Sequence, residues 1–282
     1  MATHTQTVSG VDSDLRDLAT EAVARAKKAG ATAAEAVVRE GSEFSTVVRM
    51  GDVETLKEAG SRVMGLRVFL GQRAASTYSS DFSDDGLQQL VKGAMDLARI
   101  ASEDEFAGIP EADQLGSLGD LQLYHEDVYS LPPDERIEYA RRAERAALDA
   151  DPRLKNSDGG SFDAATGHRV LANSHGFVGE YRRSYCSVSV APIAQDANGN
   201  MQRDYWYSSA RTMAKLESAE SVGKEAARRT LRRLGARKIA STQVPIVLDQ
   251  TVSGSILGNI FEAINGDSVY RQSSFLAGKL GE

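Results

Sequence analysis

The chain has 282 residues, of which 41% are hydrophobic and 26% charged, and its formal net charge is −7. This balance is that of an ordinary globular protein and excludes a collagen-like, disulfide-dense or disordered chain. Since one domain usually takes about 100–200 residues, the length predicts two domains. The negative charge disfavours bulk attraction to nucleic acid or anionic membranes, although a local basic patch stays open.

A single cysteine, Cys186, excludes an intrachain disulfide and a cysteine-rich zinc site. It fits a reducing compartment, so we predict a cytoplasmic protein. No apolar run approaches the roughly 20 residues that cross a bilayer. Met1–Gly10 lacks the apolar stretch of a secretory signal. We therefore expect no association with a membrane.

Residues 1–105 are predicted to form an amino-terminal α/β domain with a helix, β-hairpins and a second helix. A cap at Asp12 or Ser13 precedes apolar residues at helical spacing, and Gly30 ends this first helix. Ser83 is a good cap for the second helix. β-branched residues and glycine turns predict extended segments between the two helices. These segments are Ala34–Glu40, Phe44–Met50, Val53–Glu58, Arg62–Leu70 and Arg73–Ser79.

Residues 106–235 are predicted to form a central α+β domain with a long antiparallel sheet. Pro133 suits the first turn of an amphipathic helix that ends before Pro152. Turns rich in glycine and asparagine then separate extended segments as far as residue 209. One of these, Phe177–Ile193, is long for a strand, so a bend or a bulge is expected. A helix near Glu217–Leu234 closes the domain.

Residues 236–282 are predicted to begin a further domain. Val244–Asp249 has the pattern of a short buried strand, and it leads into an apolar helix at Ser253–Ile264. The tail, Gly266–Glu282, is expected to be loop or strand. Together these elements predict an α/β (α+β) fold.

Most of the familiar catalytic motifs are absent from the sequence. His125-Glu126 begins like a zinc-protease helix, but Tyr129 stands where that motif needs its second histidine. His168 and His175 have no third ligand nearby in the sequence, so we interpret them as turn residues. Cys186 is interpreted as a packed thiol, because no neighbouring base or helix start is available to activate it.

Three features keep both a functional and a structural interpretation. The basic helix around Lys224–Lys238 either forms part of a groove that binds nucleic acid or an acidic partner, or presents its charges to solvent. We favour the second interpretation. In a strand, Tyr205 and Tyr207 would share one face and Trp206 the other. This aromatic cluster of residues 205–207 either binds an extended peptide or a partner protein, or packs in the hydrophobic core and at its edge. Glu262, on an apolar helix, either faces solvent or needs a partner in a cleft.

Several segments resemble the TldD/PmbA family, whose members are also described as modulators of gyrase and as cytoplasmic metalloproteases. In the amino-terminal half, Ala33–Ala36 and the Gly65–Thr77 hairpin have counterparts in that family, as does Asn173–Gly176 further on. The carboxy-terminal segments are the more specific part, and the resemblance covers nearly the whole chain. These segments are Leu234–Lys238, Val244–Asp249, Gly266-Asp267 and Ser273–Glu282.

The resemblance implies one of two kinds of subunit. In the TldD kind, a His-Glu-x-x-x-His helix binds zinc and cleaves peptide bonds. Matching the chains at Gly266-Asp267 places Leu257, Gly258 and Glu262 at the three motif positions. None of them matches, so this chain resembles the PmbA, or TldE, kind. We expect no catalytic residue, metal or cofactor in this chain, and zinc in the partner subunit.

The resemblance also implies partners and a substrate. The subunit would pair with a TldD-type subunit, or with itself as a dimer, around a channel in which unfolded peptide lies extended. Candidate contacts to peptide or partner are Tyr205, Trp206, Tyr207, Asp267, Ser273 and Ser274. Two alternatives stay open: a regulatory protein that acts on gyrase or nucleic acid through the basic helix, and a homodimeric peptide-binding scaffold without enzymatic activity.

Members of this family continue past Gly278–Glu282 into a large, mainly β domain. We therefore expect the chain to be a fragment or the product of a truncated gene model, with residues 236–282 as the incomplete start of that domain. A strand and helix without the sheet they should join would expose apolar surface, so we expect the isolated chain to be unstable or to aggregate.

Overall fold

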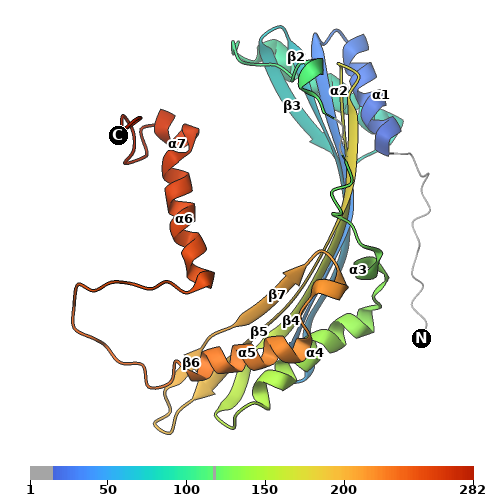
Figure 1. The fold of residues 1–282 in the computed structure, drawn as a ribbon. Helices are drawn as coiled ribbons and strands as arrows, with labels where there is room; N and C mark the ends of the chain where they lie inside the picture. Colours follow the sequence, from blue (N-terminus) through green and yellow to red (C-terminus); the bar gives the residue numbers. More distant parts are fainter. Residues whose placement is uncertain (1–14, 117–118) are drawn as a thin grey trace, which may run out of the picture. The chain divides into compact units, whose positions relative to one another are not determined.

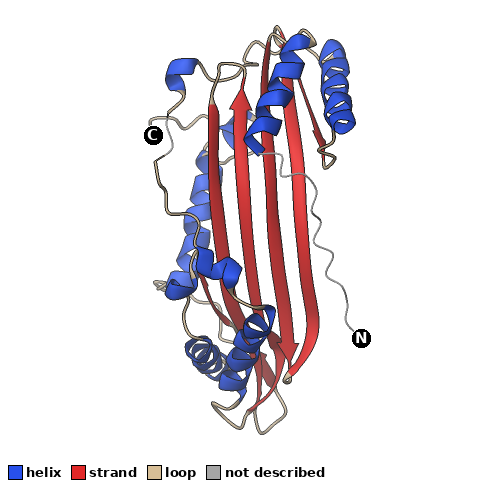
Figure 2. Cartoon of the chain, turned by 90° about the vertical axis from the view of Figure 1, so that its right-hand side faces the viewer, coloured by secondary structure: helices blue, strands red, loops and turns tan. Residues whose placement is uncertain are grey.

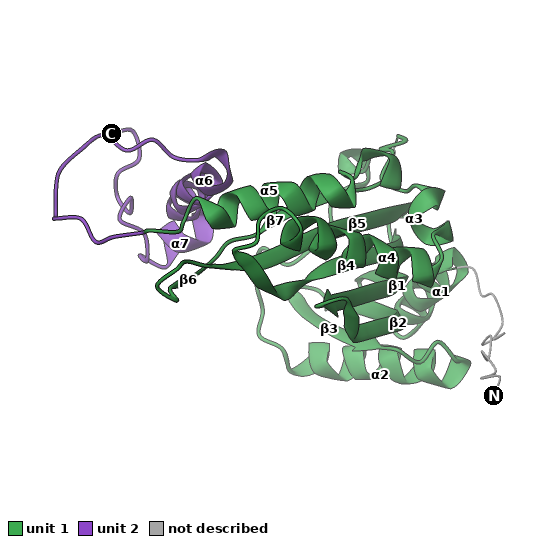
Figure 3. Cartoon of the chain, turned by 90° about the horizontal axis from the view of Figure 1, so that it is seen from below, with its two compact units in different colours: residues 1–235 green, residues 236–282 purple. Residues whose placement is uncertain are grey.

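The structure is a computed structural model that describes residues 15–116 and 119–282. The predicted helix caps Asp12 and Ser13 lie outside these residues. The chain divides into two compact units, residues 1–235 and residues 236–282 (Figure 3). The division follows Gly235, a residue in the left-handed region with φ 75°.

Helices and strands both contribute to unit 1, residues 1–235. Its helices are α1 (Leu15–Lys28), α2 (Asp84–Ile100), α3 (Glu126–Ser130), α4 (Pro133–Leu148) and α5 (Ala219–Leu231), with short 3₁₀ helices at Ala112–Gln114 and Met213–Lys215. Its strands are β1 (Ala33–Arg49), β2 (Asp52–Leu70), β3 (Arg73–Ser79), β4 (Leu154–Asn173), β5 (Val178–Gln195), β6 (Met201–Arg203) and β7 (Trp206–Ala210).

The strands form one antiparallel sheet in the order β3-β2-β1-β4-β5-β6, and β7 also pairs with β5 (Figure 1). The predicted α+β fold with a long antiparallel sheet is confirmed. Strands β1 and β4 pair from Glu35 opposite Asn173 to Val48 opposite Gly160. This pairing brings strands from both sides of residue 105 into one sheet. The proposed domain boundaries stay predictions.

The strands of this sheet are longer than predicted. The expected breaks near residues 41–43 and 59–61 are absent, because the ladder continues there through Gly41 opposite Ser61 and Gly167. The segment at Phe177–Ile193 is likewise one strand, β5, and the irregular pairing with β4 lies near Ser157. Glycine weakens a strand on its own, but neighbours on both sides hold this one in register.

The helices of unit 1 pack on one face of the sheet, because the alternation of side chains keeps its phase along each strand. On β1, Ala36 and Val38 are buried near one end, and Phe44 and Val48 near the other. All four are even-numbered, so they lie on the same face. Figure 1 shows α1 and α4 on the same side of the sheet.

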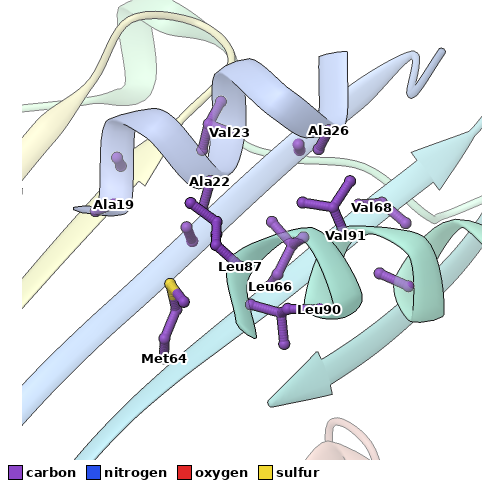
Figure 4. Close-up of a cluster of buried hydrophobic side chains, with 14 of the residues drawn as sticks. Ala19, Ala22, Val23, Ala26, Met64, Leu66, Val68, Leu87, Leu90 and Val91 are labelled. Carbon is purple, nitrogen blue, oxygen red and sulfur yellow. The ribbon is translucent and has the colours of Figure 1, made fainter. Parts of the chain in front are cut away.

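Two hydrophobic cores lie on this face. In the amino-terminal core, α1 and α2 pack over β1 and β2, with Val23, Leu90 and Leu66 among the buried side chains (Figure 4). In the central core, α4 and α5 pack over β4 and β5, around Phe162 and Val188. Between the two groups of helices, the long strands remain uncovered (Figure 2).

A buried carboxylate fastens α4 to the turn between β1 and β2. Glu144 is 1% exposed. Its carboxylate accepts hydrogen bonds from the backbone N–H of Met50 (2.8 Å), from that of Gly51 (2.9 Å) and from the Ser157 hydroxyl. Both turn residues have positive φ, so their amides converge on one acceptor. The helix, the hairpin tip and β4 are thus joined at one point.

Unit 2, residues 236–282, contains α6 (Gln250–Ile264) and α7 (Gly266–Tyr270). The predicted helix at Ser253–Ile264 is present, whereas two other predictions are wrong. Val244–Asp249 is not a strand: its Val247 is 97% exposed, and no described strand pairs with it. A strand needs a neighbour for its backbone groups, so an apolar pattern alone is not enough. The tail begins with a short helix, α7.

The apolar side chains of unit 2 lie largely in solvent. On α6, Leu257 and Phe261 are 67% and 63% exposed, and Ala263 is the buried hydrophobic residue. None of the helices in the described part of the chain has both the length and the apolar character needed to span a membrane.

We predict that Glu144→Ala lowers the free energy of unfolding by about 3 kcal/mol, since it leaves two amides and a hydroxyl without their acceptor in a buried place. The measurement is urea denaturation followed by the fluorescence of Trp206, the single tryptophan, which packs against the central core. Glu138→Ala, on the same helix, removes only an ion pair with Arg141 and should cost less than about 1 kcal/mol. Equal losses would contradict the role given to Glu144.

We also predict opposite effects from two glycine-to-alanine changes in helices. A Cβ on Gly223 would lie 2.4 Å from the Ala143 carbonyl oxygen, so Gly223→Ala must push α5 away from α4 and lower the melting temperature. A Cβ on Gly93 of α2 meets nothing nearer than 3.7 Å, so Gly93→Ala should gain about 0.5–1 kcal/mol. Thermal melts followed by circular dichroism decide this, and a stabilised Gly223→Ala would disprove the close packing.

Candidate functional site

The face of the sheet opposite the helices is polar in its middle part, with apolar residues such as Val37 and Leu171 nearer one end. We call it the open face; it carries the odd-numbered residues of β1, β2, β4 and β5. Within unit 1, the helices that the structure describes bury their apolar side chains against the even-numbered residues. The central row of the open face runs from Ser61 through Gly41 and Gly167 to Arg183. The middle of this face therefore combines polar side chains with two glycines that carry no side chain.

Two glycines form the floor of a hollow at this centre. Gly41 and Gly167 lie opposite each other on β1 and β4. A Cβ on Gly41 would come within 2.5 Å of the Thr166 carbonyl oxygen, so the close approach of the strands requires glycine. Arg183 crosses the floor, with its Nε 3.4 Å from the point where a Cβ on Gly167 would lie. The hollow has a volume of about 550 Å³.

Arginines surround this floor. Arg39 and Arg169 are directly opposite each other on β1 and β4, and Arg183 lies diagonally across from Arg169 on β5. Arg211, which follows β7, also lines the hollow. All four are exposed, and none forms an ion pair with any residue that the structure describes. Glu43 lines the hollow on the open face as well, whereas the side chain of even-numbered Glu40 lies on the helix face, so arginines exceed carboxylates there.

Two tyrosines complete the rim. Tyr181 lies opposite Arg169, and Tyr185 lies opposite Ala165, so Tyr181, Arg183 and Tyr185 alternate along one face of β5. Neither tyrosine was predicted from the sequence as a site residue. The segment Glu180–Tyr185 is polar at every position and shows no alternation of its own, and only the register with β1 and β4 brings the two tyrosines beside Arg39 and the glycine floor.

The predicted aromatic cluster divides as the alternation of a strand requires. The rings of Tyr205 and Tyr207 stack with centroids 6.3 Å apart, and both are at least half exposed. Tyr207 lies opposite Ser189 and hence on the open face. Trp206 packs against the central core, with the Arg229 guanidinium 4.2 Å from the centroid of its ring. Tyr205 and Tyr207 therefore remain candidates for contact with a ligand, whereas Trp206 stabilises the fold by packing inside the protein.

The histidines in the described part of the chain do not come together in one site. His168 Nε2 lies 3.2 Å from the Glu180 carboxylate, and His175 Nδ1 lies 3.0 Å from the Pro110 carbonyl oxygen. His125 precedes α3. Among residues 15–116 and 119–282, no group of three or more histidine, cysteine, aspartate or glutamate side chains could hold a metal ion.

The candidate residues of unit 2 lie on and after α6. Leu257, Gly258 and Glu262 are on α6, and Glu262 is exposed. The three other candidates make local contacts. The Asp267 carboxylate accepts from Arg271 at 2.9 Å, the Ser273 hydroxyl donates to the Ser268 carbonyl at 3.1 Å, and the Ser274 hydroxyl donates to the Ala263 carbonyl. These contacts fold the turn after α7 against α6.

Carboxylates within the chain engage part of the predicted basic helix. Hydrogen bonds from Arg228 and Arg229 lower the pKa of the Glu225 carboxyl to about 2. Arg233 lies 3.6 Å from the Asp204 carboxylate. Arg229 is 8% exposed and packs over Trp206, whereas Lys224 and Arg228 are exposed, so the helix presents only part of its basic residues to solvent.

Three family models match successive parts of the chain. They describe the first, central and carboxy-terminal domains of PmbA/TldA metallopeptidases, and they match residues 34–98, 126–234 and 241–282. The chain belongs to the PmbA/TldD family. It is 39% identical over 250 residues to "Metalloprotease PmbA" of Escherichia coli O157:H7, a match that covers 88% of this chain and 55% of that protein. The predicted family is thereby confirmed.

Other relatives agree with this membership. A PmbA homolog of Haemophilus influenzae is 34% identical over 274 residues, covering 96% of this chain and 59% of that protein. The chain thus spans little more than half the length of these relatives. A crystal structure from Bacteroides thetaiotaomicron, described as a modulator of DNA gyrase, matches with a TM-score of 0.87 and 28% identity, over 97% of this chain and 62% of that one. TldE from Thermococcus kodakarensis has the same fold, with a TM-score of 0.76, at 15% identity, over 93% of this chain and 58% of that one.

We predict that Cys186 is unreactive in the folded protein. Burial, with a smaller contribution from the Asp127 carboxylate, raises the pKa of the thiol from about 9 to about 11. At pH 8 only about one thiol in a thousand is then ionised. A disulfide reagent should label Cys186 at least about tenfold faster in urea than in buffer. Rapid labelling in buffer would contradict the packed position.

The pKa of Cys186 is higher in the folded protein than in the unfolded chain. The neutral thiol therefore contributes its full stabilisation below pH 9, and this contribution is lost as the pH rises toward 11 and the thiol ionises.

Proposed function

We propose that the chain is part of a PmbA/TldE-type subunit of a TldD–TldE-type metalloprotease complex that processes unfolded peptides. Membership of the metallopeptidase family supports the general activity. The observation that carries the assignment to this kind of subunit is the identity of three residues, Leu257, Gly258 and Glu262, at the positions of the zinc motif. In this proposal, the partner subunit supplies the metal.

These three residues do not fit a zinc ion. Leucine and glycine side chains offer no donor atom, and zinc in proteins takes three or four ligands from the side chains of cysteine, histidine, aspartate or glutamate. Glu262, exposed on α6, is then a single carboxylate. We therefore assign no metal chemistry to these three residues.

The open face supports the peptide part of the proposal. The side chains of an extended peptide alternate between its two sides, and pockets that receive those on one side give specificity. The open face offers a surface along β1, β4 and β5, each at least 17 residues long, and one hollow that could receive a peptide side chain. Tyr205 and Tyr207 add an exposed aromatic pair near one end.

We predict that cleavage of an unfolded peptide needs both subunits. The complete protein that carries this chain is mixed with a zinc-bearing TldD-type subunit, and cleavage is followed by mass spectrometry. Removing either subunit should lower the rate at least about tenfold, and the isolated PmbA-type subunit should contain no stoichiometric zinc. Equal cleavage by the TldD-type subunit alone, or one zinc ion per PmbA-type chain, would overturn the proposal.

A further inference from the structure

The hollow on the open face has an arrangement of charge that folding alone does not explain. Arg39 and Arg169 are direct cross-strand neighbours on the same face. Side chains in such positions have Cβ atoms about 4.5–5.5 Å apart, and like charges there destabilise a sheet. Neither arginine has a carboxylate partner among the described residues. The repulsion therefore stays uncompensated within the described part of the chain.

The neighbouring residues increase this positive charge. Arg183 reaches over the glycine floor toward Gly167, and Arg211 lines the same hollow. With Glu43 counted against the four arginines, the side chains on the open face of the lining keep an excess of three positive charges. Guanidinium groups are always ionised and offer donors in a planar fork that matches a carboxylate.

We propose that this hollow binds carboxylate groups of an extended acidic peptide. Arg39, Arg169 and Arg183 would form charge-assisted hydrogen bonds to one or two carboxylates, and the bound anion would relieve the repulsion between Arg39 and Arg169. The glycine floor leaves room for a peptide side chain, and the carboxylate comes from an acidic side chain or from the carboxyl terminus. The inference rests on the proposed function only in treating this peptide as a substrate.

The hollow suits a peptide better than nucleic acid. A polyanion would bring phosphates past Glu43 and toward a chain of net charge −7. A peptide can place one carboxylate among the arginines and neutral residues elsewhere. Tyr181 and Tyr185 flank Arg183 at every second position, which is also the spacing of side chains on one side of an extended peptide.

The test is fluorescence anisotropy with the complete protein and short labelled peptides. One peptide carries glutamate at alternate positions and an amidated end, a second carries glutamine there with a free carboxyl end, and a third carries glutamine with an amidated end. We expect one or both carboxylate peptides to bind at least about tenfold more tightly than the third, and the affinity to fall as salt rises. The first two peptides distinguish side-chain carboxylates from a terminal one.

Adjacent arginines provide a matched pair of variants. Arg183→Gln should weaken binding about tenfold, because it removes a charge-assisted hydrogen bond. Arg182→Gln removes the same charge from the residue directly before Arg183 on β5. The Arg182 side chain lies on the opposite face of the sheet, over the Tyr124 ring, so this change should alter the affinity less than about twofold. Arg183→Lys should keep part of the affinity, since it keeps the charge without the planar fork.

Three outcomes would overturn the proposal: equal binding of all three peptides, equal losses in Arg182→Gln and Arg183→Gln, or tighter binding of a single-stranded oligonucleotide than of any peptide. The assay needs no TldD-type partner. If acidic peptides fail to bind while a neutral peptide is still cleaved by the two subunits together, only this inference fails. If binding depends on the arginines but no cleavage occurs, only the proposed function fails.

Discussion

The unbroken pairing of β1 with β4 is the constraint on which the rest of unit 1 depends. Because side chains alternate along a strand, one register maintained over this length assigns every residue to one of two faces. A slip of a single residue would place Arg39 and Glu43 beneath the helices and expose Phe44 and Val48. The same register therefore determines both hydrophobic cores and the open face.

Local signals in the sequence predicted where elements begin and turn more reliably than how far they extend. Ser83 caps α2 and Pro133 begins α4 as expected, since caps and proline act through neighbouring backbone groups. Gly41 was expected to lie between two strands, yet it lies inside β1. The pairing of β1 with β2 and β4 outweighs the weak preference of glycine for extended structure. Val244–Asp249 shows the converse: its strand pattern has no described partner.

The candidate site was predictable only in part, for a similar reason. The division of Tyr205 and Tyr207 from Trp206 follows from alternation within one segment, so the sequence was sufficient. The meeting of Arg39, Arg169 and Arg183 depends on three strands that are far apart in the chain. No local pattern encodes it. The family resemblance was recognised from short segments, but it carried no information about this cluster.

The glycine floor has a consequence for how such a site can change over evolution. The depth of the hollow is determined by backbone atoms, since Gly41 and the Thr166 carbonyl oxygen approach too closely for any side chain to intervene. The charges around it belong to exposed side chains that carry no part of either core. Shape and chemical preference are thus controlled by different residues. A relative could exchange its arginines for neutral or acidic residues and acquire a new preference while the cavity kept its form.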